Sequence, residues 1–267
     1  MSNQLVLTRI EAGYRILTLN RPDKLNAFNE AMHAALRAAI DDAEADVDCR
    51  ALMITGAGRA FCSGQDLGDR LLKPGEKSKT RDSLERNFNP LVRRLRALPF
   101  PTVAAVNGIA AGAGCNIALA CDIVVAAKSA TFTQSFARVG LIPDSGGTFF
   151  LPRLVGEARA RGLALIAQEL KAEKAAEWGM IWRCVDDNAL LYEAQRICQH
   201  FSIAPTQGLS LIKQALNASA ANTLDEQLDL ERDLQHSASE LPDYAEGVRA
   251  FIEKRKPKFN GRKGKTE

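Results

Sequence analysis

The chain has 267 residues, 46% hydrophobic and 25% charged, with a formal net charge of +3. This length suits one large domain or one domain with a small addition, and the composition excludes wholesale disorder, collagen-like repeats and coiled-coil rods. No apolar run reaches the roughly 18 residues of a membrane span, and the first residues lack the pattern of a signal peptide, so we expect a cytoplasmic protein with no membrane partner.

The N-terminal part alternates short strands with a helix. Residues 6–10 and 15–20 alternate in polarity on either side of Gly13, which predicts a β-hairpin. Asn29 is a suitable N-cap for a helix that continues to about residue 45, with an apolar stripe of Met32, Leu36 and Ile40. Residues 51–55 predict a short, largely apolar strand.

Strand and helix continue to alternate up to about residue 155. A helix over 82–98 leads to a strand over 102–107, and a small-residue turn and helix over 108–120 lead to a strand over 122–126. Short apolar strands alternating with helices are typical of an α/β fold with buried, mostly parallel strands. Residues 71–80 contain Lys, Pro and Gly in succession and predict a mobile surface loop.

Strand signals nearly vanish after residue 156. Six segments are predicted as helices: 156–169, 172–179, 187–201, 208–221, 224–239 and 243–254. We therefore expect an α/β core of about 155 residues followed by a helical C-terminal region.

Most of the excess positive charge lies between residues 254 and 265. A solvated, frayed terminus is the simplest interpretation, and an anionic ligand or nucleic acid is the alternative. Because only one end of the chain is basic and few aromatic residues accompany it, we do not expect nucleic-acid binding.

The six cysteines show no C-x-x-C spacing and no accompanying histidine cluster. Without these patterns a structural zinc site is not expected, and we predict buried or free thiols. The cysteines are Cys49, Cys62, Cys115, Cys121, Cys184 and Cys198.

Two segments rich in small residues, 59–67 and 107–116, each follow a predicted strand. Turns of this kind expose backbone N–H groups, and a helix N-terminus follows the second segment, a combination that stabilises an oxyanion. The same residues would equally suit close packing with no ligand. A third segment, 139–148, places Asp144 in an apolar turn bounded by glycines, where it would act as a general acid or base or would only cap the next helix.

Five short motifs occur in the order of the crotonase (enoyl-CoA hydratase/isomerase) superfamily, which the chain resembles from about residue 5 to residue 260. The motifs are Asn20-Arg21-Pro22, Ala60-Phe61-Cys62-Ser63-Gly64-Gln65-Asp66, Ala105-Val106-Asn107-Gly108, Ala120-Cys121-Asp122 and Gly140-Leu141-Ile142-Pro143-Asp144-Ser145-Gly146-Gly147. The resemblance implies a spiral of ββα repeats over residues 1–200, C-terminal helices over residues 201–267 that form a trimer or a dimer of trimers, and a CoA thioester substrate.

The resemblance also assigns site residues by position. It implies that the backbone N–H groups of Gln65 and Ala113 hold the thioester oxygen. It places the CoA and the substrate near Lys24, Leu25, Ala27, Gly64, Asp66, Leu67, Gly112, Asn116 and Phe136. It implies no metal and no separate cofactor, because coenzyme A enters as part of the substrate.

Two positions depart from the pattern of the family's hydratases. Hydratases carry two glutamates that bind and activate water, and these should fall where this chain has Asn116 and Phe136. An amide cannot take a proton and a phenyl ring cannot orient water, so hydration is unsupported. The carboxylate is instead Asp144, where many hydratases carry Gly, a placement that resembles the family's double-bond isomerases.

Three further stretches, 88–95, 176–182 and 223–232, are similar to the family's branch of ring-1,2-epoxyphenylacetyl-CoA isomerases of aerobic phenylacetate breakdown. The branch implies conversion of the ring epoxide to a seven-membered oxepin, a shift of a 3,4 double bond to the 2,3 position, or both. Phe136, Phe149 and Phe150 would shape an apolar slot for a ring, unless they only pack in the core. The alternatives are an enoyl-CoA hydratase, an acyl-CoA hydrolase or dehalogenase, and, remotely, a non-enzymatic RNA-binding protein.

Overall fold

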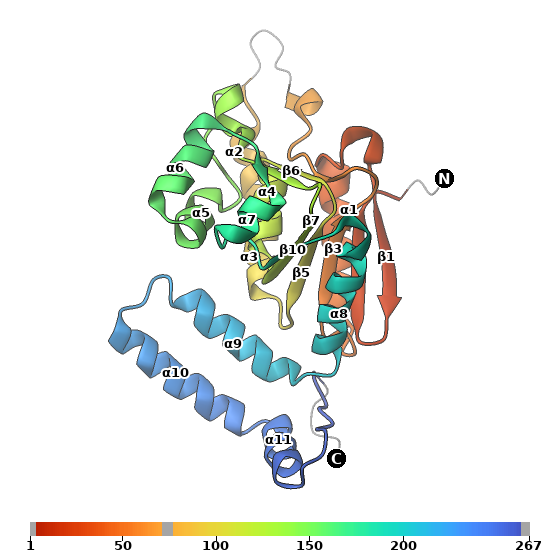
Figure 1. The fold of residues 1–267 in the computed structure, drawn as a ribbon, viewed down its shortest axis with the longest axis vertical. Helices are drawn as coiled ribbons and strands as arrows, with labels where there is room; N and C mark the ends of the chain where they lie inside the picture. The colour runs from red at the N-terminus through yellow and green to blue at the C-terminus, as the bar shows by residue number, and fades with distance from the viewer. Residues whose placement is uncertain (1–3, 71–76, 263–267) are drawn as a thin grey trace.

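The computed structural model describes residues 4–70 and 77–262, and within them the strands form two sheets (Figure 1). The larger sheet has the order β1-β2-β3-β5-β7-β10 and the smaller one β4-β6-β8-β9. The larger sheet comprises β1 (Val6–Glu11), β2 (Tyr14–Leu19), β3 (Leu52–Gly56), β5 (Thr102–Val106), β7 (Ile123–Ala127) and β10 (Arg183–Val185). The smaller comprises β4 (Ala60–Cys62), β6 (Ile109–Ala111), β8 (Thr131–Thr133) and β9 (Leu170–Lys171).

The chain winds as a spiral between these sheets. Strands β3, β5 and β7 pair in parallel in the larger sheet, and the strand that follows each of them, β4, β6 or β8, joins the smaller sheet in parallel. Each turn of the spiral therefore adds one strand to each sheet. This arrangement confirms the predicted α/β class and parallel pairing, and the predicted hairpin is β1–β2, with Val6 opposite Leu19.

Eleven α-helices lie in the described ranges. They are α1 (Glu30–Ala45), α2 (Thr80–Ser83), α3 (Asn89–Ala97), α4 (Ala113–Ala120), α5 (Gly147–Val155), α6 (Glu157–Ile166), α7 (Ala172–Glu177), α8 (Leu190–Ser202), α9 (Thr206–Ala218), α10 (Leu224–Ser239) and α11 (Pro242–Ile252). Helix α1 has the predicted cap, since Asn29 accepts a hydrogen bond from the Met32 N–H, and the predicted stripe of Met32, Leu36 and Ile40 is buried.

The structure differs from the sequence-based expectation in two places. The helix predicted over 82–98 is divided into α2, a π-helical turn η3 (Leu84–Phe88) and α3. The physical reason is Pro90, which has no N–H to donate and whose ring crowds the carbonyl one turn back, so that the helix widens before it. The strands β9 and β10 lie in the region predicted to be almost wholly helical. Residues 71–76 of the predicted loop lie outside the described residues.

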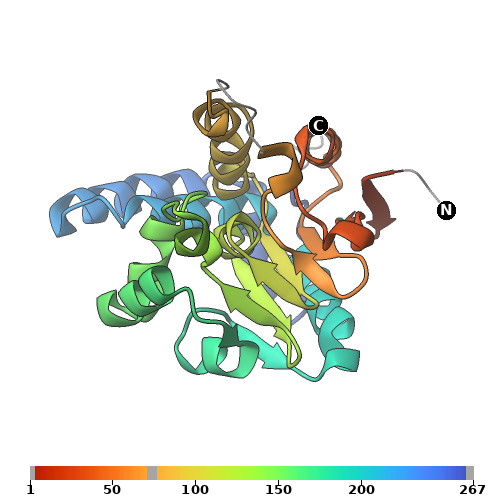
Figure 2. The ribbon, with the colours of Figure 1, turned by 90° about the horizontal axis from the view of Figure 1, so that it is seen from above.

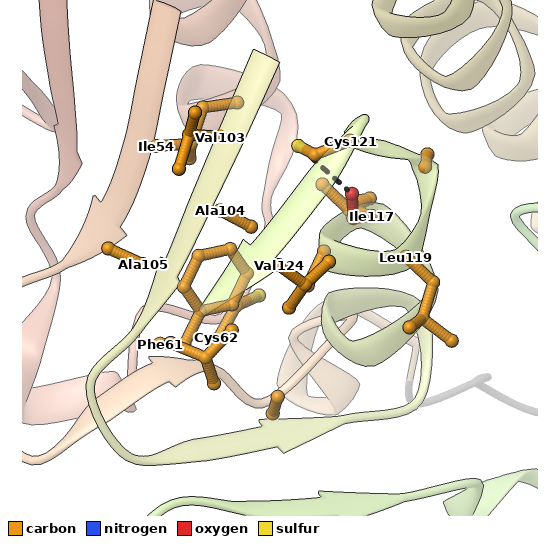
Figure 3. Close-up of a cluster of buried hydrophobic side chains, with 14 of the residues drawn as sticks. Ile54, Phe61, Cys62, Val103, Ala104, Ala105, Ile117, Leu119, Cys121 and Val124 are labelled. Carbon is orange, nitrogen blue, oxygen red and sulfur yellow. Dashed lines mark hydrogen bonds between the residues drawn. The ribbon is translucent and has the colours of Figure 1, made fainter. Parts of the chain in front are cut away.

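Figure 3 shows the core where the sheets meet α4. Phe61 and Cys62 of β4 lie beside Val103, Ala104 and Ala105 of β5, and all five are fully buried. Burying one such large apolar side chain contributes about 1.5–3 kcal/mol. The ends of the short strands, and the loops that follow them, are therefore held on a packed base.

Helices α9 and α10 lie side by side away from the sheets, and seen from above they extend from one side of the core (Figures 1 and 2). Lys213 of α9 is only 8% exposed and anchors this region to the core. Its Nζ donates to the Leu95 carbonyl at 2.7 Å and pairs with Asp122 Oδ2 at 2.8 Å. Removing one partner of such a buried pair costs about 3–5 kcal/mol.

Up to residue 262, the basic C-terminal segment is held by hydrogen bonds and ion pairs. This finding corrects the simplest interpretation of the sequence, which was a solvated, frayed terminus. Arg255 binds Glu246 through both terminal nitrogens, at 2.7 and 3.0 Å. Arg262 donates to the carbonyls of Glu44, Asp46 and Cys49 at the end of α1. A cation is favourable at a helix C-terminus, so the positive charges fasten the segment to the core. Residues 263–267, including Lys263 and Lys265, lie outside the described residues.

Candidate active site

The two small-residue segments meet through their backbones. A Cβ built on Gly64, which follows β4, would lie 2.9 Å from the Ala111 carbonyl oxygen and 3.4 Å from the Ala113 nitrogen. A Cβ built on Gly114 would lie 2.3 Å from the Cys62 carbonyl oxygen. Any larger residue at 114 would force the backbones apart, so these glycines permit the end of β4 to touch the start of α4.

This contact brings the segments of the two predicted oxyanion donors together. Ala113 is the first residue of α4, so its N–H is among those with no acceptor inside the helix, and the helix dipole adds positive charge there. Gln65 lies in a parallel bridge with Phe28, in which the Phe28 N–H donates to Gly64 and the Asp66 N–H donates to Phe28. Successive backbone amides of an extended strand point to alternate sides, so the Gln65 N–H points away from Phe28.

The segment that contains Lys24, Leu25 and Ala27 packs against the same loop. The Leu25 carbonyl accepts a hydrogen bond from the Ser63 N–H at 2.9 Å, and Ser63 Oγ lies 3.4 Å from the Lys24 carbonyl oxygen. Lys24 is exposed, whereas Leu25 is partly exposed and Ala27 is buried. The structure therefore places all three beside the Gly64–Gln65 turn.

Asn26 is a structural residue of this region that the sequence reasoning missed. Its side chain is fully buried, accepts from the Arg21 N–H at 2.8 Å and donates to the carbonyls of Ala57 and Ala60. Its φ of 56° is left-handed, a conformation that Asn tolerates better than most residues. The sequence signal that could have identified this residue is its position in the turn cluster that begins with Asn20-Arg21-Pro22.

Asp66 and Leu67 continue the loop in different ways. Asp66 Oδ2 pairs with the Arg21 guanidinium at 3.0 Å, and its Oδ1 accepts from the Gly68 N–H at 3.1 Å. Arg21 also donates to the Ala27 carbonyl, so the carboxylate of Asp66 ties the loop to the Lys24–Ala27 segment. Leu67 has an exposed apolar side chain, at 54% exposure.

Asp144 stands at the start of a tight turn into α5. Ser145 and Gly146 are both left-handed, with φ of 51° and 85°. For Ser145 this conformation costs about 1–3 kcal/mol, and its buried hydroxyl donates to Asp144 Oδ1 at 2.8 Å. The strained residue therefore holds the carboxylate, which is itself only partly buried.

The remaining predicted residues lie around α4. Gly112, with φ of 52°, precedes α4, and its N–H donates to the Thr133 carbonyl at 2.8 Å. The ring of Phe136 lies against it, 3.7 Å from a Cβ built on Gly112. Asn116 is fully buried and donates to the Asp144 carbonyl at 2.8 Å, so the structure places it behind the turn rather than on an open surface.

The three phenylalanines of the predicted slot lie in two places. Phe136 packs on Gly112. Phe149 and Phe150 instead line a cavity of about 990 Å³ between α3, α5 and α9, with the Arg96 guanidinium 5.6 Å from the Phe150 ring centre. Gly146 also lines this cavity, so it adjoins the turn of Asp144.

All six cysteines are free thiols, as predicted, and five of them are buried. Burial raises the pKa of Cys62, at the end of β4, and of Cys115, within α4, to about 12. Thiols of this kind are protonated at neutral pH and do not act as nucleophiles.

In the described ranges, no group of three or more histidine, cysteine or acidic side chains is placed to hold a metal ion. None of the helices in those ranges combines the length and apolarity needed to cross a bilayer.

The chain is similar to known proteins over nearly its whole length. Residues 9–262 match the model of the family described as enoyl-CoA hydratase/isomerase. The chain is 54% identical to the 1,2-epoxyphenylacetyl-CoA isomerase of Escherichia coli K12, over 97% of this chain and 99% of that one. It is 45% identical to a Rhodobacter capsulatus protein named "Probable enoyl-CoA hydratase", over 98% and 100% of the two chains. The structure is also similar to the crystal structure of an enoyl-CoA hydratase from Bacillus anthracis, with a TM-score of 0.90, 30% identity and coverage of 97% and 100%.

Proposed function

The chain belongs to the enoyl-CoA hydratase/isomerase family, and from that premise we propose that it is an acyl-CoA isomerase of phenylacetate breakdown. It converts ring-1,2-epoxyphenylacetyl-CoA to the oxepin-CoA, moves the double bond of a 3-enoyl-CoA to the 2,3 position, or does both. One observation carries the proposal. Ser145 holds the Asp144 carboxylate in its turn, and the resemblance to the family assigns the two glutamate positions of the hydratases to Asn116 and Phe136. The 54% identity to an isomerase of this name supports it.

In the double-bond shift, the thioester oxygen binds the N–H groups of Gln65 and Ala113. Asp144 removes a proton from C2, and the charge of the resulting enolate is stabilised by these two donors, each worth about 3–4 kcal/mol in comparable sites. Asp144 then returns the proton to C4, and the double bond lies between C2 and C3. The substrate and product have the same atoms and electrons, so the reaction needs no water and no separate cofactor, and coenzyme A is part of the substrate.

The remaining residues of the site bind the substrate in this proposal. The Lys24–Ala27 segment holds the CoA adenine. Ser63 fixes this segment beside the turn that binds the thioester. Gly64 and Gly112 allow the close approach of the thioester, and Asp66 shapes its loop through Arg21. Leu67 and Phe136 supply apolar contacts for the acyl group. Asn116 is the exception, because it is fully buried and supports the turn of Asp144 through its hydrogen bond to the Asp144 carbonyl.

Assembly and location are part of the same proposal. We place the trimerisation region at residues 201–267 and expect a trimer or a dimer of trimers, because α10 and α11 expose large apolar side chains. These are Leu224, Leu228, Tyr244, Val248, Phe251 and Ile252. We place the enzyme in the cytoplasm, where six free thiols stay reduced.

The test compares two reactions on matched chain lengths. A 3-enoyl-CoA and the phenylacetyl-CoA epoxide should be isomerised, whereas hydration of crotonyl-CoA should be several orders of magnitude slower, since each missing acid–base group is worth about 10²–10⁴-fold. Hydration as fast as isomerisation would refute the proposal. Release of free CoA or halide as the main product would show a hydrolase or a dehalogenase instead.

A further inference from the structure

Two buried side-chain amides hold the turn of Asp144 from behind. Gln134 Nε2 donates to Asn116 Oδ1 at 2.7 Å, and Asn116 Nδ2 lies 3.3 Å from Gln134 Oε1, so each amide faces the other. Asn116 Nδ2 then donates to the Asp144 carbonyl at 2.8 Å. Asn116 is 0% exposed and Gln134 is 2% exposed. Buried amides of this kind are costly unless they are hydrogen-bonded, so the pair has one favoured orientation.

Gly147 leaves room for the amide of Asn116 beside the turn. A Cβ built on Gly147 would lie 2.4 Å from Asn116 Nδ2, so a glycine at this position lets the amide reach the turn. The Gly147 N–H also donates to the Asp144 carbonyl, at 2.8 Å. The carbonyl of Asp144 thus receives two hydrogen bonds, and one of them depends on Asn116.

Gln134 also connects the two halves of the site. It follows Thr133, the last residue of β8, whose carbonyl accepts the Gly112 N–H at the start of α4. Thr133 therefore fixes the backbone beside Ala113. Gln134, the next residue, fixes Asn116 and, through it, Asp144. The end of β8 sets the position of the carboxylate relative to the oxyanion donors.

We propose that Gln134, acting through Asn116, is a positioning residue for Asp144. The inference rests on the proposed function, since it assumes that Asp144 moves the proton. Gln134 is buried and need not touch the substrate. Its effect arises because displacing a reacting group by about 1 Å can cost on the order of 100-fold in rate.

The first test is Gln134→Met, which nearly keeps the side-chain volume and removes both polar ends. We expect kcat for 3-enoyl-CoA isomerisation to fall about 10- to 100-fold, with KM within about twofold because the binding residues are unchanged. Gln134→Met added to Asp144→Asn should cause no further loss, because Gln134 acts through that carboxylate. An unchanged kcat, or a full further loss in the double variant, would overturn the inference.

The second test does not depend on the reaction. Hydrogen–deuterium exchange of residues 141–150 should be faster in Gln134→Met than in the wild type. The matched control is Gln199→Met, the same change at an exposed position on α8, which should leave both kcat and this exchange unchanged. If Gln134→Met folds poorly, Gln134→Leu serves in its place, since it also removes both polar ends and introduces no buried charge.

The two measurements separate the two proposals. A wild-type protein that isomerises no CoA ester would refute the proposed function, and faster exchange in Gln134→Met would still support the positioning of the turn. Unchanged exchange over 141–150 would overturn the positioning, whatever the activity.

Discussion

A Cβ on Gly64 would lie 3.4 Å from the backbone nitrogen of Ala113, and the φ of Gly64 is +95°. Both the close approach and the left-handed backbone require a glycine at this position. The contact joins the end of β4 to the first residue of α4, which are about 50 positions apart in the chain. It is therefore the contact on which a shared oxyanion site would depend.

Gly64→Ala should lower kcat for isomerisation about 100-fold or more, because the new methyl group would push one donor away, and losing a single oxyanion donor costs about 10²–10³-fold. Steady-state kinetics with a 3-enoyl-CoA would measure this. The matched control is Gly162→Ala in α6, where no described atom outside the neighbouring residues and the backbone of the helix itself lies within 4 Å of the built Cβ. That control should keep its activity and gain about 0.5–1 kcal/mol of stability. Equal kinetics in the two variants would contradict the role given to Gly64.

Asp144→Asn should lower kcat for isomerisation about 10²–10⁴-fold while the affinity for the CoA ester stays within a few-fold of the wild type. The amide keeps the shape and the hydrogen bond from Ser145 but cannot take a proton, and general base catalysis is worth about 10²–10⁴-fold. Titration with a non-reacting CoA ester measures the affinity, and product analysis measures the rate. Near-normal turnover would remove Asp144 from the mechanism.

Light scattering at micromolar concentration should give the mass of a trimer or of a dimer of trimers. Phe251 of α11 is 86% exposed, and Leu228 of α10 also exposes its side chain. Large apolar patches of this kind mark interaction sites. Phe251→Asp should therefore lower the mass or weaken the association. A monomeric wild type would show that these helices serve another purpose.

Acid should loosen the C-terminal segment before it unfolds the core. The hydrogen bonds from Arg255 and the Lys258 N–H lower the pKa of Glu246 from 4.5 to about 2. Because the folded-state pKa is depressed, the stability that Glu246 contributes is present above pH 4.5 and is lost as the pH falls toward 2.

Urea unfolding of the wild type and Glu246→Gln measures this effect. The wild type should be the more stable at pH 7, and the difference should shrink between pH 4.5 and 2. A difference that is the same at pH 7 and at pH 2.5 would mean that the charge of Glu246 does not hold the segment. The same comparison can be made with Glu226→Gln. Glu226 is a matched carboxylate that caps α10 through Thr223 and lies outside the C-terminal segment held by Glu246.

Patterns within short stretches of sequence were sufficient to predict much of the fold. The alternation around Gly13, the cap at Asn29 and the stripe of Met32, Leu36 and Ile40 predicted β1, β2 and α1, because backbone preference and burial are encoded locally. The same reasoning located the glycine-rich turns and the carboxylate of Asp144. The motifs also indicated the family, which the comparisons confirm.

Only the tertiary structure decided which of these residues work together. Strands β4, β6 and β8 have three residues each, too few to show a period, and they exist because each pairs with a strand far away in sequence. Asn26, Gln134 and Arg262 look like ordinary polar residues in the sequence, yet each is bonded to segments that lie 18 to 218 positions away. A local pattern specifies whether a side chain is buried, but the partner of a buried polar group depends on which distant backbone the fold brings beside it.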